Sequence, residues 1–171
     1  MIRERLFMPC KAERPFYICL RENIMHRNYY SPAEWEKIIA FSKTRETPFL
    51  VVLLDRIQQK FEAFRTNFPH AKIYYAVKSN PGVEVLSLLR DLGSYFDVAS
   101  IYELDRVLNL GVSPDHVSFG NTIKKARHVA EAYDKGVRLF TSDSEADIRN
   151  LANEAPGSRV LFRVLLDAIT S

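Results

Sequence analysis

From residue 73 onward, short apolar runs alternate with stretches whose apolar residues recur at helical spacing. The runs are rich in β-branched and aromatic residues, which is typical of buried strands. They begin about every 21 residues, near Ile73, Tyr95, His116, Arg138 and Arg159. The stretches between them place apolar residues three or four positions apart, within residues 85–92, 101–108, 126–133 and 144–154. We therefore predict five strands that alternate with four amphipathic helices.

A glycine follows each predicted helix, as is common just past a helix end, at Gly93, Gly111, Gly136 and Gly157. Strands that alternate with helices form a parallel sheet through right-handed crossovers. Because the repeat is so short, a barrel is favoured over a doubly wound sheet. A complete barrel has eight strands in ~250 residues. The predicted fold class is therefore α/β, a partial (β/α)8 TIM-like barrel of about five βα units.

No helix pattern follows the fifth predicted strand. We therefore expect the chain to be the amino-terminal part of a longer protein. An open parallel sheet exposes the backbone of its edge strands. The isolated 171-residue chain is accordingly expected to be marginally stable or prone to aggregation.

The residues before the barrel are predicted to form an N-terminal extension with one helix, residues 1–46, so that the barrel part covers residues 47–171. The helix is predicted to begin at Ser31, because Ser31 and Glu34 have the spacing of a capping box. Residues 1–30 show no clear period, although residues 14–20 are a weak strand candidate.

A second helix is predicted directly before the first barrel strand. The apolar segment Pro48–Leu54 is a strand candidate that belongs either to the barrel or to a second, β-rich domain, and Asp55 after it is placed to cap the helix. Apolar residues then recur at helical spacing, at Ile57, Phe61, Phe64 and Phe68. The helix should end before Pro69.

Composition and charge exclude several classes of protein. The net charge of +3 is small for 171 residues, so neither nucleic acid nor a membrane surface is an expected partner. No apolar run approaches the ~20 residues of a membrane span, and the amino terminus lacks the apolar core of a secretory signal. Two cysteines without metal-ligand spacing indicate reduced thiols, no metal site and a cytoplasmic protein.

The first candidate for chemistry is Lys78, which ends the apolar run that begins at Ile73. Ligands of parallel α/β proteins bind at the carboxyl ends of the strands. An amine at that position is a nucleophile that forms Schiff bases with aldehydes. The alternative is an ordinary solvated lysine at a strand end.

Three further charged residues lie in or beside predicted strands. Asp97 falls inside the next apolar strand and faces either Lys78 across the barrel mouth or a helix on the outside. Arg163 interrupts the fifth strand, where a guanidinium needs a carboxylate or phosphate partner. It either points inward to the same mouth as Asp97 or pairs outward with a helix, and the inward orientation is favoured because the strand reads as buried on both faces. Glu103 is three residues after Ser100, so it serves either a capping box or the site.

Taken together, these segments resemble the fold-type III pyridoxal-phosphate enzymes, specifically the ornithine/lysine/diaminopimelate/arginine decarboxylases, whose barrel is of the alanine-racemase type. The resemblance lies in Tyr75–Asn80 around the lysine, in Phe96–Ser100 with Glu103, in Thr47–Asp55 and in Arg163. Alanine racemases share the fold but typically continue after the lysine with an Ala-Tyr-Gly-His type segment. The Ser-Asn-Pro-Gly segment of this chain favours the decarboxylase branch.

The resemblance implies that Lys78 is the catalytic residue and forms a Schiff base with the cofactor pyridoxal 5'-phosphate. It also implies that Asp97, Arg163 and Glu103 belong to the polar network around that cofactor. The implied reaction is decarboxylation of a basic amino acid, ornithine or lysine, to a diamine on the route to polyamines. The family's remaining site residues and its homodimer partner contacts are expected beyond Ser171, so the isolated chain is expected to have little or no activity. The alternatives are a non-catalytic decarboxylase-like binding protein and a racemase or pyridoxal-phosphate carrier of the same fold.

Overall fold

The computed structural model describes residues 30–165, which divide into two compact units between Val52 and Leu53. The first unit contains helix α3 (Pro32–Ser42). The hydroxyl of Ser31 accepts a hydrogen bond from the backbone N–H of Glu34, and the Glu34 side chain accepts one from the N–H of Ser31. The predicted capping box is confirmed, and with it the predicted start of the helix.

The second unit begins with helix α4 (Leu54–Asn67), which confirms the helix predicted before Pro69. The strand predicted at Pro48–Leu54 is wrong, because no strand forms there and Leu54 already belongs to α4. A strand needs a neighbour with which to exchange backbone hydrogen bonds, and the sheet of the described residues begins only at Tyr74. Asp55 lies in the first turn of α4 and does not cap it, since the N-cap is Leu53.

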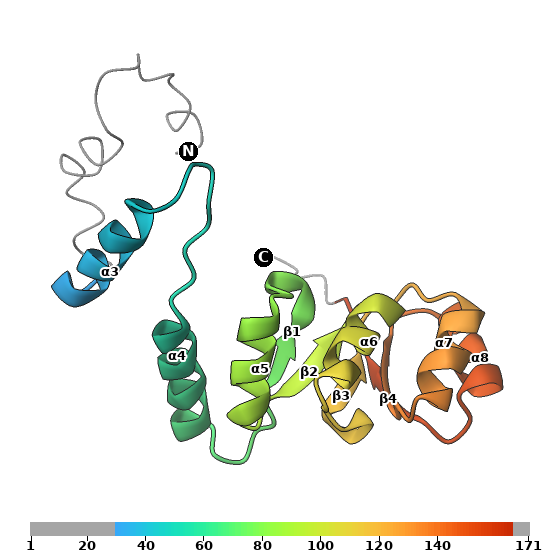
Figure 1. The fold of residues 1–171 in the computed structure, drawn as a ribbon. Helices are drawn as coiled ribbons and strands as arrows, with labels where there is room; N and C mark the ends of the chain where they lie inside the picture. The colour runs from blue at the N-terminus through green and yellow to red at the C-terminus, as the bar shows by residue number, and fades with distance from the viewer. Residues whose placement is uncertain (1–29, 166–171) are drawn as a thin grey trace, which may run out of the picture. The chain divides into compact units, whose positions relative to one another are not determined.

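Five short strands form one parallel sheet. They are β1 (Tyr74–Ala76), β2 (Tyr95–Val98), β3 (Val117–Phe119), β4 (Leu139–Ser142) and β5 (Arg159–Phe162). Their order in the sheet is the order in the chain, and every neighbouring pair is parallel (Figure 1). A doubly wound sheet would reverse its order at a switch point. The sequential order therefore fits the predicted partial barrel.

The connections between strands are helical, as predicted. They contain α5 (Val83–Asp91), α6 (Ile101–Asn109), α7 (Ala126–Asp134) and α8 (Glu145–Glu154), with the short 3₁₀ turns η1 (Val77–Ser79) and η2 (Pro114–His116). Gly93 after α5 and Gly111 after α6 have φ angles of 82° and 83°. A side chain is unfavourable in this left-handed conformation, which is why glycine ends these helices. None of the helices in residues 30–165 is long and apolar enough to cross a membrane.

Alternation along the strands decides which side chains face the helices. In β2, Phe96 and Val98 are fully buried in the core between sheet and helices, whereas Tyr95 and Asp97 are only partly buried. Successive strand residues point to opposite faces of a sheet. Burial of each large apolar side chain contributes roughly 1.5–3 kcal/mol, so the register of β2 is strongly fixed. The same register places Asp97 on the face that lies inside the barrel.

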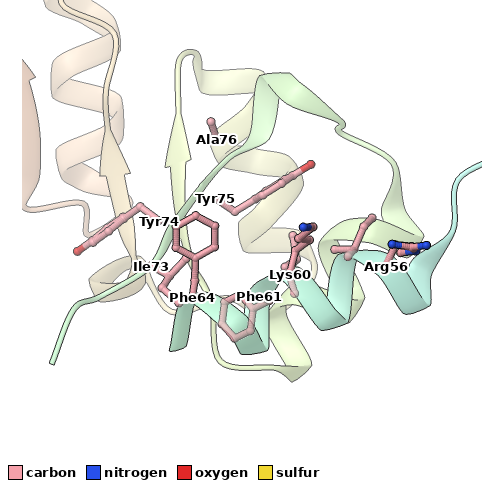
Figure 2. A pocket seen from close by; sticks show the side chains of 10 residues that line it. Arg56, Lys60, Phe61, Phe64, Ile73, Tyr74, Tyr75 and Ala76 are labelled. Atoms are coloured by element: carbon pink, nitrogen blue, oxygen red, sulfur yellow. The ribbon is translucent and has the colours of Figure 1, made fainter. Parts of the chain in front are cut away.

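The sheet does not close within the described residues. Among residues 30–165, β5 pairs only with β4, and its Leu161 and Phe162 are 56% and 59% exposed. The prediction that this strand is buried on both faces is wrong for these residues, because no further strand in the described part of the chain covers it. At the other edge, α4 and β1 border an apolar cavity of about 520 Å³, lined in part by Phe61, Phe64 and Ile73 (Figure 2).

Candidate active site

Lys78 lies directly after β1, in the turn η1, and its side chain is exposed. The neighbouring Val77 is fully buried, which anchors the turn in the core. The hydroxyl of Ser79 donates a hydrogen bond of 2.7 Å to the carbonyl of Ala76, and the amide oxygen of Asn80 accepts one of 3.0 Å from the N–H of Gly82. Local hydrogen bonds therefore hold the turn from which the exposed Lys78 side chain projects, at the carboxyl end of the first strand.

Asp97 lies on the barrel face of β2, level with Ala76 of β1 and Ser118 of β3. Its carboxylate oxygen Oδ1 accepts a hydrogen bond of 2.6 Å from the hydroxyl of Ser118. The three residues line a cavity of about 250 Å³ together with Tyr74, Leu139, Thr141 and Leu161. Of the two predicted orientations, the structure shows the inward one. Lys78 is not among the residues that line this cavity, and the predicted contact between Lys78 and Asp97 stays a prediction.

The absence of a side chain at Gly120 leaves space for the Asp97 carboxylate. A Cβ atom at Gly120 would lie 2.2 Å from Oδ1 and 2.5 Å from Oδ2 of Asp97. Both distances are far shorter than a van der Waals contact, so any side chain there would displace the carboxylate. Neither Gly120 nor Ser118 was predicted to be part of the site. The sequence pattern that could have indicated them is their position in and directly after β3, beside the strand that carries Asp97.

Glu103 orders the turn between β2 and α6. Its carboxylate oxygen Oε2 accepts a hydrogen bond of 2.7 Å from the N–H of Ala99, and its own N–H donates one of 3.3 Å to the hydroxyl of the N-cap Ser100. These contacts favour a helix-capping role for Glu103, but the predicted capping box is only half formed, because the Glu103 side chain binds the N–H of Ala99 and not that of the N-cap Ser100. The turn that they order connects Asp97 to the helix that follows, so Glu103 contributes to the site by holding its backbone.

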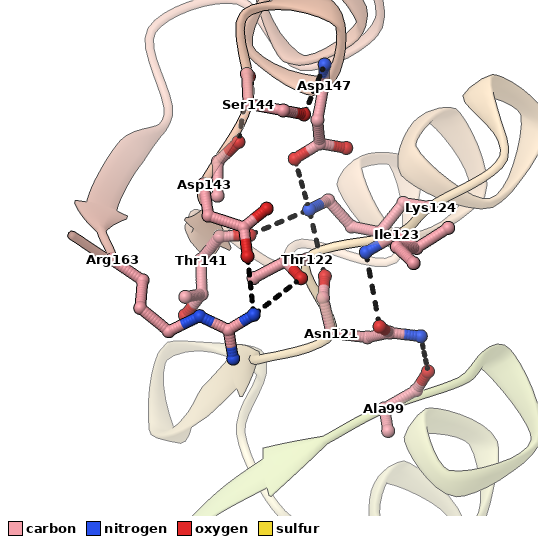
Figure 3. A network of polar contacts seen from close by, with 11 residues as sticks. Ala99, Asn121, Thr122, Ile123, Lys124, Thr141, Asp143, Ser144, Asp147 and Arg163 are labelled. Atoms are coloured by element: carbon pink, nitrogen blue, oxygen red, sulfur yellow. Dashed lines mark hydrogen bonds and ion pairs between the residues drawn. The ribbon is translucent and has the colours of Figure 1, made fainter. Parts of the chain in front are cut away.

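Arg163 lies just past β5, at the same edge of the sheet. Its guanidinium donates a hydrogen bond of 3.1 Å to the hydroxyl of Thr122 and forms an ion pair with the carboxylate of Asp143 (Figure 3). The hydrogen bond from Arg163 is the main reason why the pKa of Asp143 lies below its ordinary value. The carboxylate partner that the sequence required is therefore Asp143, in the turn between β4 and α8, and it is not on a helix.

The inward residues of neighbouring strands form level rows. Thr141 of β4 is level with Leu161 of β5, and both line the same cavity as Asp97. Asp143 and Arg163 each follow two residues later and therefore continue these two strands toward the carboxyl edge. Layered inward side chains with functional groups at the carboxyl edge are typical of parallel barrels. Within residues 30–165, no group of three or more histidine, cysteine, aspartate or glutamate side chains is placed to hold a metal ion.

This fold and this site define a class: a parallel α/β barrel domain that carries an amine and a paired arginine at the carboxyl ends of its strands. The family model described as "Pyridoxal-dependent decarboxylase, pyridoxal binding domain" matches residues 54–171. The chain belongs to this family. The predicted family, fold class and cofactor, pyridoxal phosphate, are confirmed.

Relatives and solved structures agree with this assignment. The chain is 40% identical over 129 residues to a lysine/ornithine decarboxylase of Selenomonas ruminantium, covering 75% of this chain and 33% of that protein. It is 36% identical over 126 residues to an ornithine decarboxylase of Saccharomyces cerevisiae, covering 74% and 27%. The chain thus spans between about a quarter and a third of the length of these curated relatives.

Two solved structures extend the comparison to the fold. The structure named SrLDC in complex with PLP and cadaverine has a TM-score of 0.72 and 38% identity, and the match covers 80% of this chain and 36% of that one. An arginine decarboxylase of Paramecium bursaria Chlorella virus, bound to agmatine, has a TM-score of 0.64 and 27% identity, covering 69% and 32%. The neighbours are decarboxylases of basic amino acids, and the match covers about a third of each.

Proposed function

We propose that this protein decarboxylates a basic amino acid of the ornithine or lysine type, with pyridoxal phosphate as cofactor, and releases the corresponding diamine. The observation that carries the proposal is the position of Lys78. Its amine is exposed at the carboxyl end of β1, in a domain of the pyridoxal-binding family. A relative that matches 75% of the chain is named a lysine/ornithine decarboxylase, and a structural neighbour was solved with PLP and the diamine cadaverine.

The residues present fit such a cofactor. The site combines an accessible amine, Lys78, with a fixed carboxylate, Asp97, and a cation, Arg163. When bound, pyridoxal phosphate accepts the electron pair that the departing carboxylate group leaves behind. The amine of Lys78 would be the nucleophile that bonds the cofactor aldehyde. The short, hydrogen-bonded turn fixes the backbone from which the Lys78 side chain projects.

Asp97 and Arg163 contribute charge and orientation in this proposal. The hydroxyl of Ser118 fixes the Asp97 carboxylate inside the barrel, where its negative charge attracts protonated groups of the cofactor or substrate. The side chain of Arg163 is 64% exposed although its guanidinium is paired with Asp143. It therefore retains N–H donors for the carboxylate or phosphate oxygens of a ligand.

We also infer the organisation of the working protein. It acts as a homodimer in the cytoplasm, its first 46 residues form an extension, and the barrel part starts near residue 47. The content of two cysteines in 171 residues supports a reducing compartment. No comparable observation supports the alternatives, a non-catalytic binding protein or a racemase. The relatives described above are named as decarboxylases.

The test is to map the lysine that bonds the cofactor. The protein is incubated with pyridoxal phosphate and reduced with borohydride, and the modified peptide is identified by mass spectrometry. The label should fall on Lys78 and disappear in Lys78→Ala, whereas Lys72→Ala, at the opposite end of β1, should keep it. Carbon dioxide release from ornithine and from lysine is measured in parallel on the holoprotein. A label on any other lysine, or a labelled protein that racemises and does not decarboxylate these substrates, contradicts the proposal.

A further inference from the structure

Lys124 is a buried cation that neither the motifs nor the proposed reaction accounts for. Its side chain is 0% exposed, and that of its partner Asp147 is 6% exposed. The amine Nζ donates three hydrogen bonds: 2.6 Å to Oδ2 of Asp147, 2.7 Å to the carbonyl of Thr141 and 2.9 Å to the carbonyl of Asn121 (Figure 3). All three donor positions of the ammonium group are therefore used.

These three contacts connect separate segments at the carboxyl edge of the sheet. Asn121 is in the loop after β3, Thr141 is in β4, and Asp147 is in the first turn of α8. The side chain of Asn121 extends the connection, because it donates a hydrogen bond of 3.2 Å to the carbonyl of Ala99 in the turn after Asp97. One ammonium group thus joins the loop after β3 to strand β4 and to the first turn of α8, and the Asn121 side chain extends this connection to the turn after β2.

The same loops hold Arg163 in place. Thr122, next to Asn121, accepts a hydrogen bond from the guanidinium, and Asp143, two residues after Thr141, forms the ion pair. The partners of Arg163 therefore lie on the two backbone segments that Lys124 ties together. A shift of either segment would separate Thr122 from Asp143, so that the guanidinium nitrogen that contacts both would lose one of its two partners.

We infer that Lys124, paired with Asp147, is a positioning residue that sets the place of Arg163 at the mouth of the barrel. A buried ion pair is by itself weak evidence for a stabilising role, because the desolvation of two charges offsets most of their attraction. Three directed hydrogen bonds to separate segments instead fix the positions of these segments relative to one another. The inference rests on the proposed function, since it assigns a task to Arg163 in the cofactor site.

The variants separate positioning from stability. Lys124→Met alone leaves Asp147 buried without its partner and threatens folding. The double variant Lys124→Met/Asp147→Leu removes both charges, and such apolar replacement of a buried pair is often neutral for stability. Lys124→Arg keeps a cation with several donors. The matched control is Lys135→Met, which removes a lysine that pairs with Asp105 and Glu131 on the outer helices.

The first measurement is hydrogen exchange on the cofactor-free protein, which does not depend on the proposed function. In the double variant, exchange should rise in the loop after β3 and in the turn after β4, and at the N–H of Arg163, which donates to the carbonyl of Ser142 at 2.8 Å. Exchange in α5 and in β1 should stay unchanged. A rise spread over the whole domain, or no rise at the loops, overturns the inference.

The second measurement is the dissociation constant of pyridoxal phosphate. Lys124→Met/Asp147→Leu should weaken binding by about tenfold, the scale of coupling between residues in one network, and Lys124→Arg should restore most of it. Adding Arg163→Gln to the double variant should weaken binding no further than Arg163→Gln alone, because Lys124 acts through Arg163. If the losses of cofactor affinity caused by Arg163→Gln and by the double variant multiply when the substitutions are combined, the inference is overturned.

The two readouts also distinguish the failure of each idea. If wild-type protein does not bond the cofactor through Lys78, the proposed function fails, while the exchange pattern still decides whether Lys124 positions Arg163. If the cofactor binds and the exchange pattern of the double variant equals that of Lys135→Met, the positioning role fails and the proposed function stands.

Discussion

The hydroxyl of Ser118 lies 2.6 Å from the carboxylate oxygen Oδ1 of Asp97, and Ser118 itself is only 4% exposed. The two residues are level on neighbouring strands, although 21 positions separate them in the chain. A short hydrogen bond to a charged acceptor is among the stronger kinds of hydrogen bond. It fixes one carboxylate in the cavity inside the barrel.

Removal of this hydroxyl should weaken cofactor binding. Ser118→Ala leaves the Asp97 carboxylate with one hydrogen bond fewer, and a hydrogen bond to a charged group contributes about 1.5–3 kcal/mol. We expect roughly a tenfold rise in the dissociation constant of pyridoxal phosphate, measured by titration of the apoprotein. Ser113→Ala, on the exposed side of η2 and without a capping hydrogen bond, is the control. Equal effects of the two substitutions would contradict the role assigned to Ser118.

The ion pair between Asp143 and Arg163 should make stability depend on pH in the acid range. The hydrogen bond from Arg163 to the Asp143 carboxylate lowers the pKa of Asp143 below the ordinary value of 3.8. A carboxyl whose pKa is lower in the folded state stabilises the fold above its unfolded pKa, and this contribution is lost as the pH falls through the folded pKa. The free energy of unfolding should therefore decrease more steeply below pH 3.8 in the wild type than in Asp143→Asn. Parallel curves for the two proteins over this range would disprove the pairing.

Lys135 should show the opposite dependence, at alkaline pH. Hydrogen bonds with Asp105 and then Glu131 raise the pKa of Lys135 above its ordinary value of 10.5. A raised pKa stabilises the fold below the unfolded pKa, and the stabilisation is lost as the pH rises through the folded pKa. Lys135→Met should therefore cost up to about 1 kcal/mol at neutral pH, as for a partly exposed ion pair. Urea unfolding at several pH values measures the difference, which should vanish well above pH 10.5; a constant difference would argue against the pairing.

Packing between α6 and the sheet should dominate the stability of the barrel unit. Leu104 on α6 is 0% exposed, and Leu104→Ala should lower the free energy of unfolding by about 3 kcal/mol through lost burial and a residual cavity. Tyr102 on the same helix is 85% exposed, and Tyr102→Ala should change the free energy of unfolding by less than ~0.5 kcal/mol. Denaturant titration compares the two. A loss at Tyr102 equal to that at Leu104 would contradict the register of the helix.

The order of strands and helices was readable from the sequence because it depends on local periodicity. The predicted strand starts at Tyr95 and Arg159 are the observed ones, and those near Ile73, His116 and Arg138 differ from the observed starts by one residue. The four helices end where glycines allow a left-handed turn. The strand prediction at Pro48–Leu54 was wrong because an apolar run alone does not distinguish a strand from a loop that leads into a helix. Only the presence of a pairing neighbour decides that difference.

The residues of the site could be predicted only in part from the sequence. Lys78, Asp97, Glu103 and Arg163 stood out because charges are rare beside buried strands, and the resemblance to a cofactor-binding family drew them together. Their partners did not stand out: Ser118 and Gly120 for Asp97, and Thr122 and Asp143 for Arg163. Each is an ordinary residue in its local sequence, and nothing near it in the chain shows which charge it faces.

The sequence by itself determined an alternating β/α domain, its direction of winding and the lysine at the end of the first strand, since all three follow from local patterns and chain order. The tertiary structure alone decided that Asp97 faces inward, that Arg163 pairs with Asp143, and that Lys124 is buried against Asp147. These contacts join residues 20 or more positions apart. Their geometry depends on the register between neighbouring strands, and packing of the whole core, not any single segment, sets that register.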